Sequence, residues 1–305
     1  MRDGNSYSIL SAAQVELFLR QGYLILPDCF SREVAHQWVA RAFSRLGYEQ
    51  DEPASWQVER VHLPSTMQVE LKTFSPRLWA AICDLLGGAE RISRQYIWDS
   101  FIVNLQYGIT RPWEPPTANL PGWHKDGDSF RHFLDSPEQA LQVFMVWTDI
   151  SARGGGTFVA CDSIPVIAKY LLAHPEGVLP YSFPYWKLIR QCHVFTELTA
   201  SLGDAILMHP YLLHTVSQNH SGKARIITNP PVQLLEPMRF DRENVADYSS
   251  VELAILRSLN VDKLDFRITA PREKFVPERA VVQQRLLEEE QKRLDPNHAH
   301  LPVKH

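Results

Sequence analysis

GWHKDGDSF, residues 122–130, places a histidine and an aspartate at positions 124 and 126. In a β-strand, side chains two residues apart point to the same face. His124 and Asp126 would then project an imidazole and a carboxylate toward one point. These are two of the three ligands in the 2-His-1-carboxylate triad of non-haem Fe(II) oxygenases. The third ligand has to come from another strand, so the stretch predicts a fold in which separate strands converge.

The His-x-acid pattern needs support from the rest of the chain. The sequence contains 12 histidines and 35 acidic residues among 305, so chance alone produces such matches. A second match, His174-Pro-Glu176, has a central proline that disfavours strand pairing, and we interpret it as a surface turn. Only the context of His124 can distinguish a metal site from coincidence.

That context lies in GDAILMHPYLLHTVSQNHSGKARIITNPPV, residues 203–232. Three histidines are candidates for the third ligand, and His214 is favoured over His209 and His220 because Arg225 stands 11 positions after it. A guanidinium inside an apolar strand is costly to bury unpaired, and its planar fork suits a carboxylate. A dicarboxylic keto acid could supply that carboxylate and chelate the metal with its other end.

The combination of His-x-Asp, a distal His and an Arg 11 residues later resembles the phytanoyl-CoA dioxygenase family of iron(II)/2-oxoglutarate oxygenases. Residues 18–38 and 143–159 resemble that family's opening segments and its central strand with the following turn. The resemblance covers roughly residues 10–235. It implies a double-stranded β-helix (jelly-roll, cupin-like) core, Fe(II) held by His124, Asp126 and His214, 2-oxoglutarate anchored on Arg225, and O2 as co-substrate.

The local patterns fit such a fold, mainly β with flanking helices. Helices are predicted over residues 11–22, 31–47 and 76–88, and period-two strands follow from about residue 91. Helical patterns return after residue 237. We therefore expect one domain over residues 1–305, with a core over about 10–235 and a C-terminal helical extension over 236–305. The C-terminal tail, with His298 and His300, is predicted to be flexible.

Composition excludes several other classes of protein. The net charge of −4 gives no electrostatic basis for binding nucleic acid. The four cysteines are scattered without CxxC spacing, which argues against a zinc site and a disulfide framework. No run of 18 apolar residues occurs, so no membrane span is predicted. We expect a cytoplasmic protein, monomeric or homodimeric, that binds a small molecule.

Further residues are candidates for the walls of the site. In FIVNLQYG, residues 101–108, a continuous strand would place Asn104 and Gln106 on one polar face that could line the pocket or meet solvent. Trp113 and Trp123 lie on or beside a proline-rich loop and are candidate substrate contacts, although a buried Trp is more often a core residue. The resemblance implies that Thr157 hydrogen-bonds the keto acid. The sequence fits equally well with Thr157 as an ordinary strand residue that has no such role.

The function indicated is an Fe(II)- and 2-oxoglutarate-dependent dioxygenase that hydroxylates or otherwise oxidises a C–H bond, releasing succinate and CO2. Because Asp126 fills the slot that related halogenases leave open, halogenation is disfavoured. The substrate is expected to be apolar or ring-bearing, as in secondary metabolism. An acyl-CoA is disfavoured, since the sequence shows no compact basic cluster near the expected mouth. Two alternatives remain, a jelly-roll metal-dependent lyase or isomerase without keto acid, and a non-catalytic binding protein.

Overall fold

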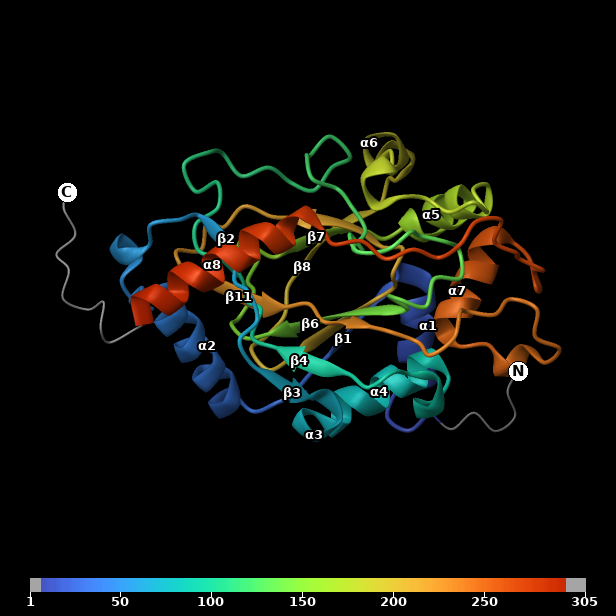
Figure 1. Ribbon diagram of the computed structural model, residues 1–305, viewed down its shortest axis with the longest axis horizontal. Coiled ribbons are helices and arrows are strands. Elements are labelled where there is room, and N and C mark those ends of the chain that lie inside the picture. Colours follow the sequence, from blue (N-terminus) through green and yellow to red (C-terminus); the bar gives the residue numbers. More distant parts are fainter. Residues whose placement is uncertain (1–6, 295–305) are drawn as a thin grey trace.

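The computed structural model describes residues 7–294, and the predicted tail with His298 and His300 lies outside them. Its centre is a large antiparallel sheet (Figure 1). The strand order in that sheet is β1 (Tyr23–Leu26), β9 (Ala205–Met208), β6 (Leu141–Val146), β11 (Arg225–Thr228), β5 (Ile102–Asn104) and β2 (Arg60–His62), with β12 (Pro231–Val232) paired to β6. Strands far apart in sequence are therefore neighbours.

A second, smaller sheet provides one of the predicted ligands. It consists of the antiparallel strands β10 (Leu213–Val216), β7 (Thr157–Ala160) and β8 (Phe195–Leu198). A further antiparallel pair is formed by β3 (Gln68–Glu70) and β4 (Tyr96–Trp98). Two antiparallel sheets with flanking helices confirm the predicted jelly-roll class.

The large sheet is buried on both faces, as β6 illustrates. All six residues of this strand, LQVFMV, are buried. Since neighbouring side chains point to opposite faces, Phe144 and Val146 belong to a small core, while Val143 and Met145 belong to a larger one. The small core also contains Val159 of β7, so it lies between the two sheets. The inner face of the large sheet is thus where side chains from both sheets meet.

Helices cover the outer face and contribute many residues to the larger core. The predicted helix boundaries are confirmed for α1 (Ala12–Gln21), α2 (Arg32–Leu46) and α4 (Pro76–Leu86). In each of the three, a serine caps the first turn and a glycine in the left-handed region follows the last residue. The remaining helices are α3 (Leu71–Phe74), α5 (Ser163–Leu172), α6 (Tyr185–Leu188), α7 (Ser250–Leu259) and α8 (Glu278–Leu294).

Two expected strands are shorter than the sequence indicates. Strand β5 ends at Asn104, because the Asn104 side chain accepts a hydrogen bond from the Tyr107 amide (3.1 Å) and Gly108 has a φ of 68°. A side-chain cap and a left-handed residue turn the chain instead of extending it. Residues 122–130 are not a regular strand either, and their only β-bridges in the described structure are isolated ones, from His124 to His214 and from Phe130 to Lys274. The expected continuous alternation through both stretches is wrong.

The last helix is attached to the helical layer at the start of the chain. Arg45 of α2 forms two hydrogen bonds to Glu290 of α8, at 2.8 and 2.9 Å, and both side chains are buried. In Figure 1, α8 crosses the front of the molecule toward α2.

The division of the chain at about residue 235, the oligomeric state and the cytoplasmic location stay predictions. Within residues 7–294, no helix has the length and apolarity needed to cross a membrane.

One aromatic contact joins the sheet to α2 and is a test of this packing. Trp147, fully buried at the end of β6, stacks on Trp38 with ring centroids 4.3 Å apart. We predict that Trp147→Ala lowers the free energy of unfolding by about 3–5 kcal/mol, because it leaves a cavity in the core. The control is Trp186→Ala, at a side chain 63% exposed, with an expected change within about 0.5 kcal/mol. Urea unfolding of both variants measures this, and equal losses would contradict the packing described.

Candidate metal and co-substrate site

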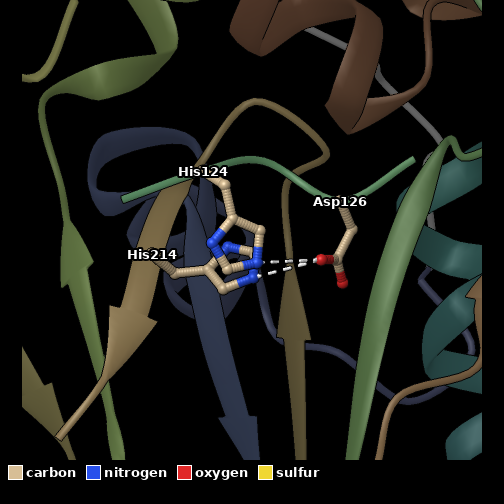
Figure 2. A group of neighbouring side chains, drawn as sticks. All are labelled: His124, Asp126 and His214. Carbon is tan, nitrogen blue, oxygen red and sulfur yellow. Dashed lines mark ion pairs between the residues drawn. The ribbon is translucent and has the colours of Figure 1, made fainter. Parts of the chain in front are cut away.

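The three predicted ligands meet at one point (Figure 2). Nε2 of His124 lies 3.3 Å and Nε2 of His214 lies 3.5 Å from Oδ1 of Asp126. The two imidazole rings are tilted, with centroids 4.4 Å apart. One ligand atom from each residue fits within 4.8 Å of the others. Two imidazoles and a carboxylate in this arrangement are suited to a divalent transition metal such as Fe(II).

Backbone pairing sets the positions of the two histidines. The amide of His124 donates to the carbonyl of His214 (3.0 Å), and the amide of His214 donates to the carbonyl of His124 (2.9 Å). This single bridge attaches the loop before Asp126 to strand β10. Each Nδ1 lies against a backbone carbonyl, that of Gly122 at 2.7 Å and that of Leu212 at 3.1 Å. Such a hydrogen bond places the proton on Nδ1 and leaves Nε2 as the free metal ligand.

The carboxylate of Asp126 is oriented from its other side. Its Oδ2 accepts hydrogen bonds from two side-chain amides, those of Gln142 on β6 and of Asn229 after β11, the latter at 3.1 Å. Burial favours the protonated acid, but His214 and His124 prevail and hold the pKa of Asp126 well below its usual range. The residue therefore presents an ionised Oδ1 to the two imidazoles. Outer contacts of this kind fix metal ligands in place.

Lys125, between the two ligands, supports the segment from behind. Its buried ammonium lies 2.6 Å from Nδ1 of His132 and donates to the backbone carbonyl of Asp126 at 3.1 Å. It also lies over the rings of Phe130 and Phe183. Burial lowers the pKa of Lys125 to about 7. The segment is thus held by contacts on both sides of its backbone, without strand pairing at Asp126.

A cavity of about 1340 Å³ contains all three ligands and Arg225. Arg225 is buried at the start of β11, where its Nε donates to the carbonyl of Gly155 (2.6 Å) and its Nη1 to that of Ile102 (3.1 Å). Burial and the nearby Arg60 lower its pKa to about 9. Among residues 7–294, no carboxylate lies within ion-pair distance of this guanidinium. A buried cation that faces a cavity without an anionic partner fits a carboxylate ligand.

The other cofactor candidates divide into two groups. Thr157 on β7 lines the same cavity as the triad and Arg225. Asn104 and Gln106 are not among the residues that line it. The side-chain amide of Asn104 donates hydrogen bonds to the backbone carbonyls of Gly155 and Ser217, at 3.3 and 3.1 Å, so this residue stabilises the turn instead. Of the two alternatives for Asn104 and Gln106, a polar wall or contact with solvent, this cavity gives no support to the wall, and the strand ends at Asn104.

Neither predicted tryptophan is placed in the cavity wall. Trp123 is buried in the larger core, and its Nε1 donates to the carbonyl of Thr117 at 3.0 Å. Trp113 packs edge-on against Phe158 and under the guanidinium of Arg153. Both tryptophans hold the proline-rich loop on the protein. The aromatic residues that do line the cavity are Trp98, Phe130, Phe144, Tyr185 and Phe275.

Several residues of the site were not identified from the sequence. Gln142 is a polar residue within an apolar strand, the same signal that drew attention to Arg225, and Asn229 follows β11 directly. Arg60 and Arg279 also line the cavity, as does Lys274, so the expectation of no basic cluster near the mouth is wrong. Arg60 is more than 200 residues from Lys274 and Arg279, and no local pattern reveals that all three line one cavity.

Comparisons with known proteins place the sequence in context. The sequence profile for "Phytanoyl-CoA dioxygenase (PhyH)" matches residues 18–227. No curated protein is similar enough in sequence to count as a match. Among solved structures, the non-heme alpha ketoglutarate dependent carbocyclase SnoK from nogalamycin biosynthesis is 16% identical, with 75% of this chain and 86% of that chain covered and a TM-score of 0.43. HygX from Streptomyces hygroscopicus, with nickel and 2-oxoglutarate bound, is 13% identical, with coverages of 89% and 98% and a TM-score of 0.43.

The triad gives a direct prediction about metal binding. The wild-type protein should take up about one Fe(II) per chain, and replacing both His124 and Asp126 by Ala should abolish uptake while the fold persists. Gln142→Leu should weaken metal affinity by roughly 10–100-fold, because Asp126 loses an orienting contact. Anaerobic calorimetry with Fe(II) measures all three proteins.

The matched control is Gln233→Leu, at a cavity residue with no hydrogen bond to Asp126. Its metal affinity should equal that of the wild type. Unchanged stoichiometry in the double variant would rule out the triad as the metal site, and circular dichroism verifies that the variant is folded.

Proposed function

The chain belongs to the phytanoyl-CoA dioxygenase family, and we propose that it is an Fe(II)- and 2-oxoglutarate-dependent oxygenase that oxidises a C–H bond of a small molecule. The observation that supports this proposal most is one shared cavity. It contains the His124, Asp126 and His214 cluster together with the buried guanidinium of Arg225, which lacks a carboxylate partner within residues 7–294. A metal cluster and a carboxylate receptor in one cavity are what a chelating dicarboxylic keto acid requires.

Each residue of the site has a distinct task in this proposal. His124, Asp126 and His214 would hold the iron through Nε2, Oδ1 and Nε2. When bound, Fe(II) with 2-oxoglutarate and O2 supplies the oxidising chemistry, and 2-oxoglutarate leaves as succinate and CO2. Gln142 and Asn229 keep Oδ1 of Asp126 turned toward the histidines.

Arg225 would bind the carboxylate of 2-oxoglutarate that does not chelate the metal. Two of its nitrogens are occupied by backbone carbonyls, which fixes the orientation of the guanidinium before any ligand arrives. Thr157, on the opposite sheet, lines the same cavity and would add a hydroxyl donor to the keto acid. The cavity wall also contains Phe144 and Ile227, which would give a bound co-substrate apolar contacts.

The presence of a carboxylate among the three ligands bears on the reaction type. Asp126 lies with His124 and His214 in one cluster, so its carboxylate would occupy the position that a chloride would need in a halogenase. Hydroxylation is therefore favoured, with desaturation or rearrangement as outcomes of the same initial hydrogen abstraction. The aromatic side chains of the cavity suit an apolar or ring-bearing substrate.

Two other functions make different demands on Arg225. A metal-dependent lyase or isomerase of the same fold has no keto acid and no use for an unpaired guanidinium beside the metal. A non-catalytic binding protein needs neither the metal cluster nor its orienting contacts. The conjunction of the cluster, the Gln142 and Asn229 contacts and Arg225 favours the oxygenase over both.

Arg225 provides the test of the co-substrate site. Removing one partner of a buried, hydrogen-bonded charge pair costs about 2–5 kcal/mol, which corresponds to roughly thirty-fold to several-thousand-fold weaker binding. Arg225→Ala should therefore raise the KM and the Kd for 2-oxoglutarate at least about tenfold, with Fe(II) affinity unchanged. Arg225→Lys should recover only part of the loss, because an ammonium lacks the bidentate fork.

Succinate release measures KM, and anaerobic calorimetry on the metal-loaded protein measures Kd. Arg32→Ala, at an exposed arginine at the start of α2, is the matched control and should behave as wild type. If the wild-type protein neither binds 2-oxoglutarate nor requires it, the lyase alternative replaces the oxygenase.

A further inference from the structure

We propose that the substrate carries an anionic group, a carboxylate or a phosphate, on an apolar ring system, and that Arg60 and the C-terminal segment 273–283 select it. The proposal rests on the oxygenase function above, because it names the substrate class of that same cavity. It is carried by three observations: the C-terminal segment is part of the cavity wall, cationic side chains gather there without enough acidic partners, and the interior behind them is aromatic.

The C-terminal segment is built into the wall of the cavity through its backbone. Lys274 forms a β-bridge with Phe130, four residues after Asp126. The amide of Arg131 donates to the carbonyl of Glu273 (2.9 Å), and the amide of Phe275 donates to the carbonyl of Ser129 (2.7 Å). The segment therefore continues directly alongside the chain that carries two metal ligands. It lies outside residues 18–227, the part of the chain that the family profile matches.

Ion pairs hold the segment at three points along its length. Arg131 binds Glu273 at 2.6 Å, and the Nη2 of Arg279 lies 3.0 Å from Oδ1 of Asp128. Farther along α8, Glu290 is fixed to Arg45 of α2. Lys274, Phe275, Arg279 and Gln283 are thereby kept in the cavity wall.

Another part of the cavity wall comes from the edge strand β2. Arg60 pairs with Asn104 on β5, and Asn104 pairs with Arg225 on β11. Directly opposed residues of antiparallel strands point to the same face, so Arg60 and Arg225 are on the inner face of the large sheet, about two strand spacings or roughly 10 Å apart. Arg60 is thus one step farther from the sheet centre than the proposed 2-oxoglutarate anchor.

The charges of the cavity do not balance. Apart from Lys125, whose pKa is lowered to about 7 by burial, its lining has four basic side chains, Arg60, Arg225, Lys274 and Arg279, and three acidic ones, Asp126, Asp128 and Glu138. Asp126 is a proposed metal ligand, and Asp128 is paired with Arg279. Within residues 7–294, neither Arg60 nor Lys274 has an acidic side chain within ion-pair distance. Fe(II) and the dianion of 2-oxoglutarate cancel one another, so they do not remove this excess.

The excess of positive charge is local, because the whole chain has a net charge of −4. A cavity lined by one sign of charge concentrates ligands of the opposite sign. The aromatic side chains Trp98, Phe130 and Phe275 line the same space as Arg60 and Lys274. The guanidinium of Arg60 lies over the ring of Tyr107, 5.0 Å from its centroid, and has no acidic partner within residues 7–294. A ring-bearing anion satisfies both features, with its ring against the aromatic residues and its anionic group at Arg60 and Lys274.

The experiment uses three probes with one ring system: naphthoate, its neutral amide naphthamide, and naphthyl phosphate. Calorimetry measures their Kd values for the protein loaded with Mn(II) and saturating 2-oxoglutarate without O2, so that Arg225 is occupied and no turnover occurs. At least one of the two anions should bind about tenfold or more tightly than the amide, and high salt should reduce that preference. A preference between the anions distinguishes a carboxylate from a phosphate substrate.

Variants assign the preference to residues. Arg60→Ala and Lys274→Ala should each reduce the affinity for the preferred anion about tenfold, with little change for naphthamide or 2-oxoglutarate. Arg32→Ala and Lys72→Ala, at exposed residues outside the cavity, are the matched controls and should leave every Kd unchanged. Because both Arg60 and Lys274 are exposed, their replacement should not unfold the protein.

Two outcomes would overturn the proposal: equal or absent binding of both anions relative to the amide, or a preference that survives in both cavity variants. Failure of the oxygenase function has a different signature. In that case the wild-type protein does not bind 2-oxoglutarate, whereas the effects of Arg60→Ala and Lys274→Ala on the anion remain measurable without it.

Discussion

The two reciprocal hydrogen bonds between the backbones of His124 and His214 are the contact on which the site depends. His214 belongs to a strand of the small sheet, whereas His124 and Asp126 lie on a segment with no regular secondary structure. A single bridge therefore connects an irregular segment to a rigid one, at the residue that has to be placed most accurately. Asp126 is then fixed by side chains from the large sheet and the turn after it, so the cluster is held by both sheets at once.

The burial of the large sheet on both faces explains where polar residues occur in it. Its outer face packs on helices and holds mostly apolar side chains, such as Val143 and Met145, and its polar residue Thr228 accepts a hydrogen bond from Trp147 at 3.1 Å. On the inner face, Gln142 near one end of the paired strands and Arg225 near the other interrupt otherwise apolar strands. Each of these two polar groups is hydrogen-bonded, and each has a task in the proposed site: Gln142 orients a proposed metal ligand, and Arg225 would bind the proposed co-substrate. The strands thus combine a packed core with polar groups that serve the proposed site.

The sequence was sufficient to locate features that are defined by residues close together in the chain. The helix caps, the His-x-Asp pair and the Arg 11 residues after His214 are local patterns, and the structure brings His124, Asp126, His214 and Arg225 into one cavity. The reasoning failed where a turn replaced a strand, since the side-chain cap from Asn104 ended an alternation that otherwise continues in the sequence. It also could not reveal that Arg60 and Lys274, more than 200 residues apart, line one cavity, because each reaches it through a different pairing, Arg60 through β5 and Lys274 through Phe130.

The attachment of the last helix to α2 has a consequence for how the protein matures. During synthesis the N-terminal parts of a chain emerge and fold first. His124, Asp126, His214 and Arg225 all precede residue 228, and Asn229, which orients Asp126, follows directly, so the proposed metal site is synthesised before the wall formed by residues 273–283. That wall is in place when Lys274 pairs with Phe130, and the contact of Glu290 with Arg45 attaches the helix that continues from it. A newly made chain would therefore pass through a stage in which the proposed site lacks this wall, and the C-terminal segment ends that stage.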